Sequence, residues 1–194
     1  MKLSKKINAI IILFITGITS AQEIITDRPD QTESSSTLPA KSLQIEAGSL
    51  FQRSSGIQTN AYPSVLWRHG VTKGVEFRFL TQFETNKQLN SSLKNSGISD
   101  IQVGTKIQLL KKENINTEIA FLSHLILPTA KSELSNNNIG TINKLSISHS
   151  LSKNIDLGYN VGYDYFGTGN GNLTYSVALG VSLSQKKNLI IITP

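Results

Sequence analysis

Eight charged residues recur at alternating positions within strand-like segments, and they are the set in this chain with most capacity for chemistry. Three are cationic and five are anionic. Successive side chains of a β-strand point to opposite faces, so each of these residues falls on the polar face of its segment. The mixed signs favour ion pairs across a shared interior over a single-sign field that attracts one class of solute. We therefore expect this set to line a lumen: Glu46, Arg68, Glu76, Arg78, Lys106, Glu118, Asp156 and Asp164.

The histidines and glycines do not indicate a catalytic or metal site. His69, His124 and His149 lie far apart and lack the spacing of a metal motif. His124 falls on a polar face, so a Ser/His hydrolase that modifies lipid is the enzymatic alternative, although one histidine among many serines is expected by chance. The run Gly169-Asn170-Gly171 is followed by no predicted helix, unlike a phosphate loop. We predict no enzyme activity, no catalytic residue, no metal and no cofactor.

Alternation of apolar and polar residues continues along nearly the whole chain from Lys41. Many segments of about ten such residues, separated by turns, are typical of an outer-membrane β-barrel. The connections at 85–97 and 128–138 are long and polar, and they alternate with short ones, as at the two rims of such a barrel. The pattern predicts an all-β, antiparallel, up-and-down transmembrane barrel of about eight strands, with room for a short ninth over 188–193. The eight cover 42–53, 61–69, 73–84, 98–110, 114–127, 140–151, 154–166 and 172–184.

A soluble lipocalin-like or sandwich protein would show the same alternation, because the pattern alone does not say which face meets solvent. Several of the polar sets are small and uncharged, whereas a water-exposed face usually carries more Lys and Glu. The predicted strands also exceed the usual soluble length of roughly 5–6 residues. These features favour lipid on the apolar face, which includes Val75, Phe77, Phe79, Tyr159, Val161, Tyr163, Val177 and Leu179.

The first 21 residues have the organisation of a secretory signal peptide. A positive start with Lys2, Lys5 and Lys6 precedes an apolar core over 9–18, and Thr19-Ser20-Ala21 resembles a cleavage site. About ten apolar residues are too few for a spanning helix, which needs roughly 20. We predict three parts: a signal peptide over 1–21, an extended arm over 22–40 and a barrel over 41–194. The arm is expected in the periplasm or tucked into the barrel mouth.

Charge and cysteine content narrow the possible partners. The formal charge of +6 falls to +3 once the leader and its three lysines are removed. No basic cluster is interleaved with aromatic residues, so a nucleic-acid partner is not expected. The chain has no cysteine, which excludes a disulfide scaffold. The expected surroundings are outer-membrane lipid and small solutes.

Six motifs, in order, resemble a family of Gram-negative outer-membrane proteins. The family is described as transporters of the "MetA-pathway of phenol degradation" type. The resemblance implies a barrel that passes small molecules, hydrophobic or aromatic ones among them, and it carries over no catalytic residue. It spans about residues 22–184 and rests on Ile25–Ser34, Leu43–Gly48, Gly70–Arg78, Gly97–Lys106, Leu125–Thr129 and Leu157–Tyr163.

The sequence therefore predicts passive transport across the outer membrane. The main alternative is a structural or adhesion barrel with a plugged lumen that acts through its long loops. Family members usually continue with further strands, whereas here a continuously apolar run over 188–193 leads to Pro194. We expect this run to close the barrel poorly, as a shortened end would. The strand at 42–53 is then either unpaired or paired directly with 172–184.

Overall fold

The computed structural model describes residues 26–27, 32–112, 115–184 and 187–193, and they form one antiparallel sheet. Nine strands follow one another along the sheet in chain order, and the short β4 pairs with β3 beside this path. The strands are β1 (Leu43–Ser54), β2 (Ile57–Thr72), β3 (Val75–Gln88), β4 (Lys94–Ile98), β5 (Ile101–Leu110), β6 (Thr117–Leu127), β7 (Gly140–Ser152), β8 (Ile155–Tyr165), β9 (Asn172–Ser184) and β10 (Lys187–Thr193).

The predicted strands are all present, including the short ninth as β10. The prediction missed β4, which lies mostly in the segment expected to be a loop over 85–97. There Thr85 and Asn86 of β3 pair with Ser96 and Asn95, and the Thr85 and Ser96 hydroxyls lie 2.9 Å apart. This hairpin is polar on both faces, so it lacks the alternation by which strands are recognised.

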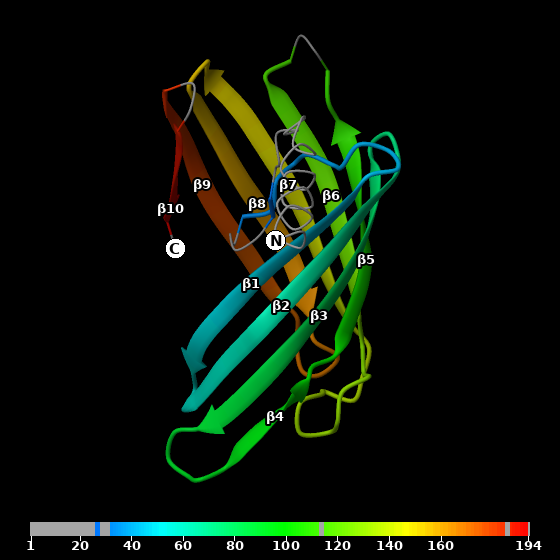
Figure 1. Cartoon of the computed structure of the whole chain (residues 1–194), viewed down its shortest axis with the longest axis vertical. Coiled ribbons are helices and arrows are strands. Elements are labelled where there is room, and N and C mark those ends of the chain that lie inside the picture. The colour runs from blue at the N-terminus through cyan, green and yellow to red at the C-terminus, as the bar shows by residue number, and fades with distance from the viewer. Residues whose placement is uncertain (1–25, 28–31, 113–114, 185–186, 194) are drawn as a thin grey trace, which may run out of the picture.

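The sheet curls strongly into a half-barrel, with its strands inclined to the long axis (Figure 1). Among the described residues β1 pairs only with β2, and β10 pairs only with β9. The expected barrel is therefore seen as an open half-barrel, because no strand pairing within the described residues joins its two ends. In the described part of the chain the free edge of β1 has no partner strand, and 172–184 does not pair with it; an unpaired first strand is one of the two arrangements expected.

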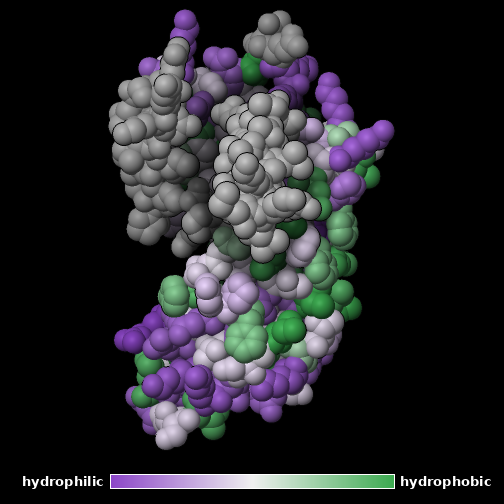
Figure 2. All heavy atoms as spheres, viewed as in Figure 1, coloured by the Kyte–Doolittle hydropathy of each residue, from purple (hydrophilic) through white to green (hydrophobic). Residues whose placement is uncertain are grey.

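The two faces of the sheet differ in polarity. Hydrophobic side chains gather along the right-hand edge in Figure 2, where Figure 1 places β3 and β5. On the outer face Phe77, Val161 and Tyr163 are each about half exposed. The alternate positions carry buried polar side chains, among them Arg68, Glu76 and Lys106. The apolar face is thus the outer one. No helix long and apolar enough to cross a membrane occurs in the described part of the chain.

Candidate functional site

The N-terminal arm, as far as it is described, lies against the inner face of the curled sheet. Its blue trace in Figure 1 passes in front of β7 before the chain enters β1. The Ser35 hydroxyl lies 2.6 Å from that of Ser148 on β7, and the Ser36 hydroxyl donates to Glu118 on β6 at 3.1 Å. The arm therefore contacts the wall of the sheet opposite β1.

Asp27 of the arm joins three cations from three strands. Its Oδ2 lies 2.6 Å from Lys106 Nζ on β5, 2.7 Å from Arg78 Nη1 on β3 and 3.2 Å from Arg68 Nη1 on β2. The Asp27 backbone N–H donates to Glu46 Oε2 on β1 at 2.9 Å. A single carboxylate of the arm thus bridges the inner ends of side chains from β2, β3 and β5.

The strand register explains why this carboxylate is needed. Arg68 and Arg78 face each other directly across β2 and β3, so two guanidinium groups share one position on the inner wall. Glu76 accepts from Arg68 Nε at 2.9 Å and from Arg78 Nη1 at 3.0 Å. Arg68 also donates to Glu46 at 2.8 Å. The wall alone brings three cations against two carboxylates, and the arm supplies further negative charge. Buried charges persist in proteins when they are paired and hydrogen-bonded in this way.

Glu33 ties the arm to both sides of the half-barrel. Its carboxylate lies 3.0 Å from Arg78 Nη2 and 3.7 Å from Lys106 Nζ. Its backbone N–H donates to Asn160 Oδ1 on β8 at 2.6 Å, and its carbonyl accepts from Asn160 Nδ2 at 2.9 Å. These contacts complete the ion cluster, by which we mean Asp27, Glu33, Glu46, Arg68, Glu76, Arg78 and Lys106.

The cluster stabilises the ionised form of Asp27. Burial by itself would raise the pKa of this carboxyl. The charges of Lys106, Arg78 and Arg68, together with the hydrogen bond from Lys106, outweigh burial and hold the pKa well below its usual range. Asp27 is therefore a permanent negative charge inside the half-barrel near neutral pH.

The end of the arm is fastened at Gly70 on β2. The Leu38 N–H donates to Glu76 Oε2 at 2.9 Å, and the Lys41 N–H donates to the Gly70 carbonyl at 2.6 Å. A Cβ atom at Gly70 would overlap the Pro39 carbonyl oxygen. Glycine at this position lets the arm lie directly on the strand.

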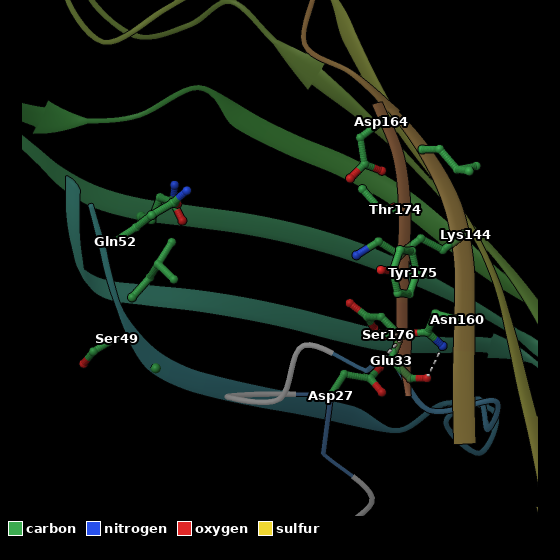
Figure 3. A pocket seen from close by; sticks show the side chains of 14 residues that line it. Asp27, Glu33, Ser49, Gln52, Lys144, Asn160, Asp164, Thr174, Tyr175 and Ser176 are labelled. Carbon is green, nitrogen blue, oxygen red and sulfur yellow. Dashed lines mark hydrogen bonds between the residues drawn. The ribbon is translucent and has the colours of Figure 1, made fainter. Parts of the chain in front are cut away.

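A pocket of about 670 Å³ adjoins the ion cluster (Figure 3). Asp27 and Glu33 form its boundary on the side of the arm, and β1, β7, β8 and β9 supply most of the other walls. Lys144, Asp164, Asn160 and Thr174 line it with polar groups. Its volume falls in the range of about 300–1,000 Å³ that is typical of small-molecule sites.

A row of residues across three strands positions the polar groups of the pocket. Lys144 of β7 pairs with Gly162 of β8, which in turn pairs with Thr174 of β9. A Cβ atom at Gly162 would lie 2.8 Å from Lys144 Cγ and 2.9 Å from Thr174 Oγ1. The Lys144 stem and the Thr174 hydroxyl therefore both lie over this glycine, and Asp164 follows two residues further along the same strand.

The sequence from the arm to β10 matches a known protein family. The model of the family described as "Putative MetA-pathway of phenol degradation" covers residues 26–192. The chain belongs to this family. No curated protein and no solved structure matches it.

In this member of the phenol-degradation family, the structure brings five of the eight predicted lumen residues into the ion cluster and places the other three elsewhere. Asp164 is buried beside the pocket. Glu118 is half-buried and lies 2.9 Å from Lys111 Nζ. Asp156 is exposed and accepts from the Ser150 hydroxyl at 2.7 Å. The five in the cluster are Glu46, Arg68, Glu76, Arg78 and Lys106.

The histidines of this family member are dispersed over the sheet. His124 Nδ1 lies 3.2 Å from Gln102 Oε1, His69 Nδ1 lies 3.0 Å from the Ser42 carbonyl oxygen, and His149 lies between Thr117 and Tyr159. Within the described ranges, no group of three or more His, Asp or Glu residues could hold a metal ion.

Sequence reasoning missed three residues of the site: Asp27 and Glu33 of the arm, and Lys144 of β7. The arm has no periodicity, so nothing local assigns it to a face of the sheet. Lys144 alternates with Leu145 and Asn143, but the segment over 140–151 has little apolar character, so the pattern gave weak support for placing Lys144 on the polar face. Charge balance gave no signal either, because the predicted lumen set already held five carboxylates for its three cations.

Proposed function

We propose that the protein is an outer-membrane β-barrel through which small molecules pass by diffusion, with no enzymatic activity. The observation that carries this proposal is the polar pocket of about 670 Å³ on the inner side of a curled sheet whose outer side is apolar. A solute that enters a conduit loses hydrogen bonds to water. Polar side chains on the wall of the lumen can replace these hydrogen bonds.

The outer face supports a membrane location. Leu43, Trp67, Val161 and Leu173 are exposed to 62%, 40%, 48% and 74%, and they belong to β1, β2, β8 and β9, toward the two ends of the sheet. An apolar surface of this extent is unfavourable in water and is typical of contact with lipid or another protein. The predicted signal peptide lies outside the described residues and remains a prediction in support of export.

A second candidate function is a structural or adhesion barrel with a filled lumen. The ion cluster favours it, because the arm occupies the inner face and is held there by buried ion pairs. The long connection after β6 is also ordered at its start: Asp100 accepts from the Ala130 N–H at 2.9 Å and from the Ser135 hydroxyl at 2.8 Å. A fixed loop of this kind suits recognition at the rim.

Conductance across a planar lipid bilayer separates the two functions. The protein is purified in detergent, refolded and added to the bilayer, with heat-modifiable gel mobility as the check on folding. Passive transport predicts discrete conductance steps that change when Lys144 or Asp164 in the pocket is neutralised. A folded, inserted protein that gives silent bilayers would support the structural barrel instead.

A further inference from the structure

The pocket beside the arm carries two opposite charges that do not form a close pair. Lys144 and Asp164 come from the neighbouring strands β7 and β8, and both project toward the same space in Figure 3. Among the described residues Lys144 makes neither an ion pair within 4.0 Å nor a hydrogen bond. The two charges are therefore held apart on one wall of the pocket.

Asp164 has unused hydrogen-bonding capacity. Its side chain is more than nine-tenths buried, and its Oδ1 has no hydrogen-bond partner in the described part of the structure. The Thr174 hydroxyl, which also lines the pocket, interacts with the Asp164 carboxyl group. Most buried polar atoms in proteins are satisfied, so the unpartnered Asp164 Oδ1 beside the pocket indicates a group that binds there.

Three other polar residues of the pocket, Asn160, Glu33 and Asp27, are already engaged by neighbouring groups, and this limits which ligand fits. Asn160 is engaged with the backbone of Glu33 and accepts from the Ser176 hydroxyl at 3.3 Å. Glu33 and Asp27 are neutralised by Arg78 and Lys106. The charges that remain for a ligand are thus one ammonium, at Lys144, and one carboxylate, at Asp164.

We propose that this pocket binds a small zwitterion of the free amino-acid type, with its carboxylate at Lys144 and its ammonium at Asp164. Hydrogen bonds in which one partner is ionised are stronger than neutral ones, so a ligand that supplies both charges binds better than one that supplies either alone. The inference rests on the proposed function, because it names the solute class for the conduit.

Saturation-transfer NMR on the full-length protein in deuterated detergent measures binding independently of transport. The probe is L-alanine, compared with propionate and ethylamine, which each carry only one of its two charges at neutral pH. We expect alanine to bind more tightly than either. K144Q and D164N should each weaken alanine binding by about tenfold, since each removes one charge-assisted contact. K144R retains the charge and should retain binding.

Two matched variants test whether the loss of any charge, also outside the pocket, weakens alanine binding. K111Q removes a cation that pairs with Glu118 outside the pocket, and D156N removes an exposed carboxylate. Both should bind alanine as the unmodified protein does. Equal alanine binding in all variants, or no binding to the folded unmodified protein, would overturn the proposal. If propionate binds as tightly as alanine and D164N does not affect its binding, the pocket is an anion site and not a zwitterion site.

Glycerol entry into proteoliposomes separates this inference from the proposed function. Glycerol has no charge, so its entry depends on an open path and not on the charges at Lys144 and Asp164. If glycerol enters and K144Q and D164N do not change alanine binding, the transport proposal is supported and the zwitterion site is refuted. If alanine binding depends on both residues but glycerol does not enter, the zwitterion site is supported and the transport proposal is refuted.

Discussion

The Asp27 carboxylate lies 2.6 Å from the Lys106 ammonium, although 79 residues separate them in the chain. Both groups are fully buried. This contact fixes the start of the arm on the inner wall formed by β2, β3 and β5. The arm is consequently an integral part of the half-barrel interior, and the behaviour of the lumen depends on it.

Loss of the Asp27 charge should destabilise the fold strongly. In D27N, Arg68, Arg78 and Lys106 lose a shared negative partner while they remain buried, which typically costs about 3–5 kcal/mol. The free energy of unfolding can be followed in lipid vesicles by the fluorescence of Trp67, the single tryptophan. D156N, at the exposed rim, is the matched control and should change the stability by less than about 0.5 kcal/mol. Equal stability of D27N and D156N would show that the buried contact contributes nothing.

Stability should depend on pH through the lowered pKa of Asp27. Its pKa in the unfolded chain is near the ordinary value of 3.8, and the folded pKa lies well below it. A carboxyl group of this kind contributes stability that is fully present above the unfolded pKa and is lost as the pH falls through the folded pKa. The difference in unfolding free energy between the unmodified protein and D27N should therefore be constant from pH 7 to about pH 5 and shrink below pH 4. A difference that shrinks between pH 7 and pH 5 would contradict the assigned pKa shift.

Gly70 should tolerate no side chain where the arm crosses it. G70A places a methyl group against the Pro39 carbonyl, so the end of the arm must move away from β2. We expect faster proteolysis within 32–40 and a loss of about 1–3 kcal/mol in stability. G48A on β1 is the control, because a Cβ atom there has no neighbour within 4 Å. Protease resistance that is the same in G70A and G48A would count against close docking of the arm.

Arginine should be tolerated differently on the two faces of the sheet. V177R places a charge on the outer face, and near the middle of a bilayer this costs about 2–4 kcal/mol. G158R places the same charge on the inner face, where a Cβ atom at Gly158 makes only an ordinary contact of 3.9 Å with Thr32 of the arm and where polar groups face the charge. Folded yield in vesicles, measured by heat-modifiable mobility, should fall for V177R and much less for G158R. Equal yields would refute contact between the outer face and lipid.

Local periodicity was enough to predict most of the sheet but not its interior. The strands around Phe77, Val161 and Val177 follow from alternation, because one apolar face and one polar face repeat with a period of two. The position of the arm does not follow, since Asp27 and Glu33 meet their partners only after the sheet has curled. The continuously apolar run over 188–193 indicated poor closure, but which arrangement β1 adopts depends on pairing between strands at opposite ends of the chain.

Uptake of glycerol by lipid vesicles tests the proposal of passive transport most directly. Vesicles that contain the folded, unmodified protein should admit glycerol faster than empty vesicles. The double variant D27A/E33A, in which the arm loses its ion pairs to Arg78 and Lys106, should admit it faster still if it folds. Glycerol entry no faster than in empty vesicles, with the unmodified protein shown to be folded and inserted, would contradict transport and support a plugged structural barrel.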